Sequence, residues 1–136
     1  MRVFLDTNVL VAAFATRGLC ADVVRAILAE HELLTSPTVL DELSRALTTK
    51  IRLPEQTKRD ILSFLKSHAT IVDEKPAMPP VKVRDEDDVV VLGEALAGGA
   101  ELLVTGDKDL LTVGDLPSIR IVDPRGFWQT IRREPK

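Results

Sequence analysis

The chain has 136 residues, of which 45% are hydrophobic and 29% charged, and its formal net charge is −3. This length and composition predict one domain, residues 1–136, and the single cysteine, Cys20, excludes an intramolecular disulfide or a zinc site of several thiolates. No apolar run approaches ~18 residues and the chain opens directly on a strand pattern, so we expect a soluble, cytoplasmic protein without membrane contact.

Short apolar runs rich in β-branched residues alternate with segments of helical periodicity along the chain. We predict strands near residues 2–5, 33–35, 69–73, 101–105 and 119–122. We predict helices near residues 8–15, 20–30, 38–49, 55–67, 88–98 and 124–132, with a short helical turn near 108–112. The proline-rich segment 75–84 indicates an extended loop inside the domain.

This alternation of strands and helices predicts a three-layer α/β/α fold around a parallel five-stranded sheet. If the fourth strand returns to lie beside the first, the strand order is 3-2-1-4-5. In such sheets the ligand crevice lies beyond the carboxyl ends of the strands, where the winding reverses. Asp6 follows the first strand and Asp107 follows the fourth, so we expect these two carboxylates to lie side by side.

Helical periodicity selects Asp88 from the acidic run R-D-E-D-D. Steps of 100° place Asp88 on the same face as Leu92 and Ala95, whereas Asp87 points the other way together with Glu94. Capping of the helix by Asp87 or Asp88 is the alternative, and such a cap contributes about 1 kcal/mol.

The other polar positions have similar alternatives. Glu42 lies at the edge of the apolar stripe of its helix, where it either leans inward or remains an ordinary surface residue. Asp107 lies in G-D-K-D, which also suits a turn, and Asp109 is a suitable cap for the short helix that follows. Asn8 is equally suited to cap the first helix, and Thr105 to be a plain hydroxyl at a strand end.

Four acids meeting in one crevice raise one another's pKa and resist ionising together. A divalent cation removes this repulsion, and a set of oxygen ligands without Cys or His suits Mg²⁺ or Mn²⁺. Such a site polarises phosphoryl oxygens and activates water. The acids therefore indicate phosphodiester hydrolysis. His31 and His68 are expected at the surface, away from these acids.

Four motifs in this order resemble the PIN domain family over roughly residues 1–130. They are D-T-N at 6–8, S-P-T-V-L-D-E-L at 36–43, R-D-E-D-D at 84–88 and L-L-V-T-G-D-K-D-L at 102–110. Each motif is weak by itself, but the four in this order are specific. The full pattern is similar to the branch that contains VapC-type toxins of toxin–antitoxin pairs.

The resemblance implies a Mg²⁺- or Mn²⁺-dependent endoribonuclease that hydrolyses single-stranded RNA. By the same resemblance, the residues that bind the metal and catalyse the reaction are Asp6, Glu42, Asp88 and Asp107. Asn8 and Thr105 would orient these ligands by hydrogen bonding, and Asp109 would share part of the role of Asp107. The resemblance further implies a cognate antitoxin protein and a homodimer. Relatives often carry Pro at the position of Glu86.

Two other functions compete with the nuclease. One is a catalytically silent PIN-fold module that binds RNA or protein. The other is a phosphate-accepting receiver domain, which is disfavoured because no lysine follows the last predicted strand in I-R-I-V-D-P-R-G-F. For contact with RNA phosphates the candidates are Arg17, Arg45, Lys50, Arg52 and Lys108. Phe127 and Trp128 lie in an apolar helical pattern and are expected in the core or at a dimer contact.

Overall fold

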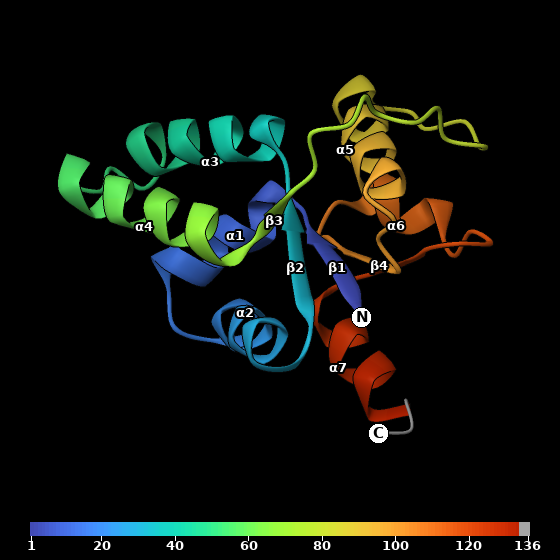
Figure 1. Ribbon diagram of the computed structural model, residues 1–136, viewed down its shortest axis with the longest axis horizontal. Coiled ribbons are helices and arrows are strands. Elements are labelled where there is room, and N and C mark those ends of the chain that lie inside the picture. Colours follow the sequence, from blue (N-terminus) through green and yellow to red (C-terminus); the bar gives the residue numbers. More distant parts are fainter. Residues whose placement is uncertain (134–136) are drawn as a thin grey trace.

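The computed structural model describes residues 1–133 and contains one parallel sheet flanked by helices (Figure 1). The strands are β1 (Arg2–Leu5), β2 (Glu32–Thr35), β3 (Thr70–Ile71), β4 (Leu102–Val104) and β5 (Arg120–Val122). The helices are α1 (Thr7–Ala15), α2 (Leu19–Glu30), α3 (Pro37–Thr49), α4 (Glu55–His68), α5 (Glu86–Ala97), α6 (Lys108–Val113) and α7 (Pro124–Arg133).

The sheet has the order β3-β2-β1-β4-β5, and all its neighbouring strands are parallel. The order predicted from the sequence is therefore confirmed. Leu5, the last residue of β1, lies opposite Val104, the last residue of β4. The pairing continues one step beyond the strand, because the backbone N–H of Asp6 donates to the carbonyl of Val104 over 3.0 Å. Asp6 thus emerges at the point where the winding of the sheet reverses.

The central strands are buried on both faces. Val3, Phe4 and Leu5 each have 0% exposure, and successive residues of a strand point to opposite sides of the sheet. Helices must therefore cover both sides, which confirms the predicted three-layer architecture. Phe127 of α7 is also fully buried and belongs to this core, as expected from its apolar pattern.

The third strand is shorter than predicted, because it covers two residues instead of residues 69–73. β3 is an edge strand that pairs only with β2, and both of its side chains are exposed. A single further bond, from the N–H of Val72 to the carbonyl of Thr35, extends the pairing before the chain enters the proline-rich loop. The edge position leaves nothing on the outer side to continue the strand.

The loop between β3 and α5 lies against α5 (Figure 1). The N–H of Ala77 donates to the carbonyl of Gly93 over 3.0 Å. A Cβ atom at Gly93 would lie 2.4 Å from the carbonyl oxygen of Ala77, so this close approach requires glycine. Val72 packs equally closely on Gly98 of the same helix. These contacts bury a face of α5 that would otherwise meet solvent.

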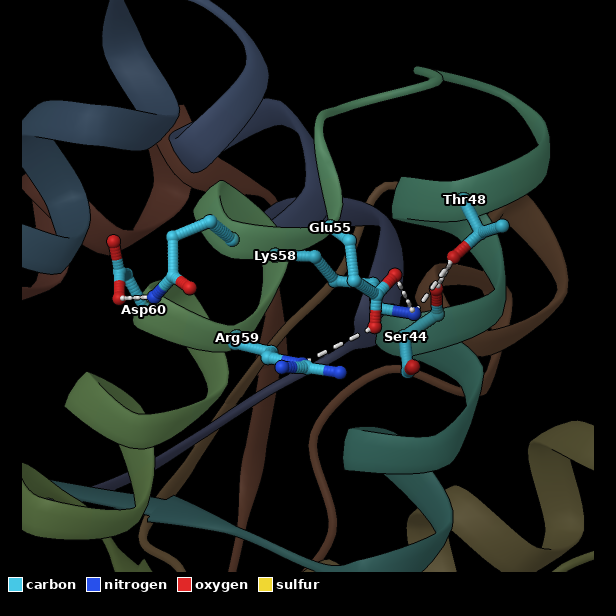
Figure 2. A network of polar contacts seen from close by, with 7 residues as sticks. Ser44, Thr48, Glu55, Lys58, Arg59 and Asp60 are labelled. Carbon is cyan, nitrogen blue, oxygen red and sulfur yellow. Dashed lines mark hydrogen bonds and ion pairs between the residues drawn. The ribbon is translucent and has the colours of Figure 1, made fainter.

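Helices α3 and α4 pack side by side and share a polar network at their surface (Figure 2). Lys58 of α4 donates to the hydroxyl of Thr48 in α3 over 3.1 Å. Lys58 and Arg59 also form ion pairs with Glu55, at 3.1 and 3.4 Å. The charged groups of this region therefore neutralise one another. Among the described residues, no helix combines the length and apolar character needed to cross a membrane.

Candidate metal centre

Asp6 is held rigidly at the end of β1. Its Oδ1 accepts a hydrogen bond of 2.8 Å from the N–H of Thr7, so Asp6 is the cap of α1 and Asn8 is not. Its Oδ2 accepts a hydrogen bond of 2.7 Å from the Thr105 hydroxyl. Burial raises the pKa of Asp6, and the charge of Asp107 adds to this, whereas the hydrogen bonds from Thr105 and Thr7 lower the pKa. Both oxygens of the carboxylate thus have a fixed direction.

Thr105 joins the ends of β1 and β4. Its side chain has 0% exposure, and its hydroxyl oxygen also accepts a 3.0 Å hydrogen bond from the N–H of Asp107. Asp107 in turn caps α6, because its Oδ1 accepts hydrogen bonds from the N–H groups of Asp109 and Leu110. The predicted cap of this short helix, Asp109, is therefore wrong. The turn and the site do not exclude each other, since one oxygen of Asp107 caps the helix and one is left.

Asp88 projects from the first turns of α5 into the same place. The cap of α5 is Asp85, whose Oδ1 accepts from the N–H of Asp87 over 2.8 Å, so neither Asp87 nor Asp88 is needed for capping. One carboxylate oxygen from each of Asp88, Asp107 and Asp109 lies within 4.8 Å of the others. The structure therefore brings together acids from α5 and from the segment after β4.

The environment of Asp88 opposes its charge. The residue is 7% exposed, and its Oδ2 is buried without a hydrogen-bond partner among the described residues. Burial, followed by the charges of Asp107, Asp85 and Asp6, raises the pKa of Asp88 to about 7. A carboxylate in this position gains more from a nearby cation than an exposed one does.

Glu42 lies on the other side of Asp6, outside the group formed by Asp88 and Asp107. It is half-buried on α3, and its Oε2 accepts a 3.0 Å hydrogen bond from the hydroxyl of Thr7. Thr7 therefore binds Asp6 through its N–H and Glu42 through its hydroxyl. This bridging role of Thr7 was not predicted from the sequence, where the residue is merely one of several strand-end hydroxyls.

Glu94 is a buried acid that the sequence analysis did not assign to the site. Its side chain is 4% exposed, although periodicity places it on the same face as Asp87, away from Asp88. Burial raises its pKa, the hydroxyls of Ser36 and Thr38 lower it, and the charge of Glu42 raises it. The available signal in the sequence is a glutamate within the apolar run V-V-V-L-G-E-A-L-A.

The basic side chains predicted to contact RNA surround these acids only in part. Arg45 and Lys50 line a hollow of about 270 Å³ together with Thr7, Asn8 and Glu42. Arg17, between α1 and α2, is exposed, as are Arg52 beyond α3 and Lys108 at the start of α6. Within residues 1–133 the ion pairs lie elsewhere, on β1, β2, α2 and α4. The acids of the site thus have no cationic partner among the described residues.

The two histidines take no part in the site. His68 is exposed at the end of α4, and its Nδ1 lies 2.9 Å from the carbonyl of Phe64. His31 is half-buried after α2, where its Nδ1 lies 3.1 Å from the amino group of Met1. This end of the sheet is opposite to the carboxyl ends of the strands.

The donor set at the strand ends fits a hard divalent cation. All its ligand atoms are oxygens, one of them is buried without a partner, and the charges of Asp6, Asp88 and Asp107 repel one another. Mg²⁺ and Mn²⁺ bind such oxygen sets. Asp6, Asp88 and Asp107, with Asp109 beside them, are the residues that would hold the ion.

Comparisons with known proteins agree with this architecture. The family model of the PIN domain matches residues 2–109 of the chain. The solved structure of VapBC2 from Rickettsia felis, bound to a DNA fragment from their promoter, contains a similar chain, with 19% sequence identity and a TM-score of 0.65. The match covers 89% of this chain and 97% of that one, and shows a shared fold. A search of curated protein sequences gave no match. The family model spans most of the chain, which therefore belongs to the PIN domain family.

Proposed function

We propose that the chain is a Mg²⁺- or Mn²⁺-dependent endoribonuclease that hydrolyses single-stranded RNA. The observation that carries this proposal is the buried, unpaired carboxylate of Asp88, which lies within 4.8 Å of carboxylate oxygens of Asp107 and Asp109. An acid cluster without a cationic partner is costly as a structural device. Its cost is understandable if the cluster exists to bind a divalent cation together with a phosphate group.

Each residue of the site has a definable role in this reaction. Thr7 and Thr105 fix both oxygens of Asp6, so that this carboxylate enters the site in one orientation. Asp88 and Asp107 bring negative charge against it from α5 and β4. A bound Mg²⁺ or Mn²⁺ supplies the positive charge that polarises a phosphoryl oxygen and activates water. The chain contributes orientation, and the hydroxyl of Thr105 maintains it by serving Asp6 and Asp107 at once.

Binding of the RNA backbone is assigned to the bases beside the acids. Arg45 and Lys50 line the hollow next to Glu42, and their charges suit the phosphates that flank the cleaved bond. Lys108 follows Asp107 directly and is exposed. These groups contact phosphates and therefore supply affinity without reading the base sequence. Arg17 is the most distant of the four candidates along the chain from the strand ends.

The biological setting is proposed to be a toxin–antitoxin pair. The solved relative is VapBC2 in complex with promoter DNA, and the motifs of this chain resemble VapC-type toxins. We therefore propose a cognate antitoxin protein that covers the acidic site, a homodimer of this chain, and action in the cytoplasm. A catalytically silent module that binds RNA or protein is the alternative.

The test is cleavage of an end-labelled, unstructured RNA by the purified chain. Cleavage is expected with Mn²⁺ or Mg²⁺, and it should stop with EDTA and return when the ion is restored. A duplex of the same sequence should be cut far more slowly. Activity that persists in EDTA would contradict the metal-dependent mechanism.

Two matched variants sharpen this test. Asp88→Asn should reduce cleavage at least ~100-fold, because a metal ligand is lost. Asp87→Asn removes the same charge from the next position of the same helix, where the side chain is exposed, and should retain cleavage. If the wild-type chain binds Mn²⁺ but cuts neither RNA, the silent-module alternative replaces the nuclease.

A further inference from the structure

Glu94 is a second buried acid of α5 whose charge is not balanced within the described part of the chain. Its side chain is 4% exposed, and its Oε1 has no hydrogen-bond partner among these residues. An ionised carboxyl group in such a place is strongly disfavoured without a counter-charge. Since glutamine or a hydrophobic residue would avoid this cost, the carboxylate calls for a functional explanation.

Glu94 and Asp88 leave α5 in different directions. Six residues separate them, which corresponds to about 9 Å along the helix axis and a difference of about 120° around it. Asp88 faces Asp107 and Asp6, whose charges raise its pKa. Glu94 instead faces the start of α3, where the hydroxyls of Ser36 and Thr38 and the charge of Glu42 act on it. The helix therefore delivers one acid to each side of Asp6.

The side on which Glu94 lies has its own unpaired oxygen ligands. The Oγ1 atom of Thr35, the last residue of β2, has 0% exposure and no hydrogen-bond partner among residues 1–133. Ser36 follows it and is also fully buried. Glu42 is held toward Asp6 by the hydroxyl of Thr7. Buried oxygen atoms without donors thus gather around the carboxyl end of β2, as they do around that of β4.

We infer that Glu94 and Glu42 form a second divalent-cation position, on the β2 side of Asp6, beside the one formed by Asp88 and Asp107. The inference rests on the proposed metal centre and extends it to a residue that the family motifs do not include. Thr7 connects the two positions, because its N–H binds Asp6 and its hydroxyl binds Glu42. Two adjacent cations stabilise both the attacking and the leaving oxygen of a phosphoryl displacement.

A purely structural role for Glu94 predicts different behaviour. In that role the carboxylate would anchor α5 to the N-terminal end of α3, where helix dipoles favour negative charge. Removing it would then lower stability equally with and without metal and would not change the number of bound ions. Counting bound ions therefore separates the two explanations without any measurement of RNA cleavage.

The experiment is a Mn²⁺ titration of the purified chain, with free Mn²⁺ measured by electron paramagnetic resonance. The wild type is expected to bind two ions per chain, and Glu94→Gln only one, with the affinity of the remaining ion changed less than about threefold. Glu30→Gln, an exposed glutamate of α2, is the matched control and should bind two ions. Glu94→Asp keeps the carboxylate on a shorter arm and should weaken the second ion at least ~10-fold.

The outcomes distinguish failure of the inference from failure of the proposed function. A wild type that binds one ion, or two ions that Glu94→Gln retains unchanged, would overturn the second position while leaving the first intact. A wild type that binds no Mn²⁺ would overturn both. If Glu94→Gln does not fold, as judged by circular dichroism, the Glu94→Asp titration decides, because unchanged binding of both ions by that variant contradicts the inference.

Discussion

Acidic residues in two regions of this molecule have opposite surroundings. On α4, Glu55 pairs with Lys58 and Arg59, and these pairs lower its pKa (Figure 2). At the ends of β1 and β4, Asp6 and Asp88 are buried beside other acids, and their pKa values are raised. The first arrangement is complete within the chain. The second lacks a cation, and this difference identifies the strand ends as the place where something else binds.

The largest expected effect comes from breaking the shared hydroxyl of the acidic region. Thr105→Val leaves Oδ2 of Asp6 and the N–H of Asp107 without their partner, because one hydroxyl serves both groups. We expect RNA cleavage and Mn²⁺ affinity to fall ~10- to 100-fold, which is typical when support for a metal ligand is lost.

The control for this change is Thr112→Val on α6. The Thr112 hydroxyl only donates to the carbonyl of Lys108 in its own helix and is exposed. Cleavage by this variant should match the wild type. Equal losses in Thr105→Val and Thr112→Val would show that the effect comes from general destabilisation, and not from the site.

The second effect is a dependence of stability on pH in the absence of metal. The pKa of Asp88 is raised from 3.8 to about 7 on folding, so the folded chain holds a proton there that the unfolded chain has lost. This contribution to stability is complete below pH 3.8 and disappears as the pH rises through 7. Since one pKa unit corresponds to about 1.4 kcal/mol, the free energy of unfolding should fall on the order of 2–4 kcal/mol.

Urea unfolding in EDTA between these pH values measures this loss. Asp88→Asn should be nearer to pH-independent and more stable than the wild type at neutral pH, because it removes a repelled charge. The raised pKa values of Asp6 and Glu94 act in the same direction and leave a residual slope. A wild type that gains stability as the pH rises would contradict the unfavourable charge assigned to Asp88.

The smallest effect is expected in the paired region. Glu55 is exposed, and solvent screens its ion pairs with Lys58 and Arg59. Glu55→Gln should therefore lower the urea midpoint slightly in dilute buffer, and about 1 M salt should abolish the difference. Addition of Mn²⁺ should raise the stability of this variant as much as that of the wild type. A larger loss than in Thr105→Val would reverse the contrast between the two regions.

The sequence predicted those parts of the site that follow from regular structure. Asp6 and Asp107 are adjacent because parallel strands end at one edge, and Asp88 follows from the period of its helix. Local capping chemistry was less predictable, since Asp6, Asp85 and Asp107 cap helices for which other residues were equally suitable.

Glu94 could not be assigned from periodicity, because long-range packing buries it. The face of α5 that carries it is covered by the loop that bonds Gly93 through Ala77, and by Val72 against Gly98. Neither contact has a local signal in the sequence. A helix face that periodicity describes as polar can thus be the wall of a site when a distant loop covers it.

The central claim is that the acids at the strand ends bind a divalent cation, and isothermal titration calorimetry with Mn²⁺ at neutral pH, without RNA, tests it most directly. The account predicts saturable binding by the wild type, the same binding by Asp87→Asn, and binding at least ~100-fold weaker by Asp88→Asn. No binding by the wild type, or equal binding by wild type and Asp88→Asn, would contradict it.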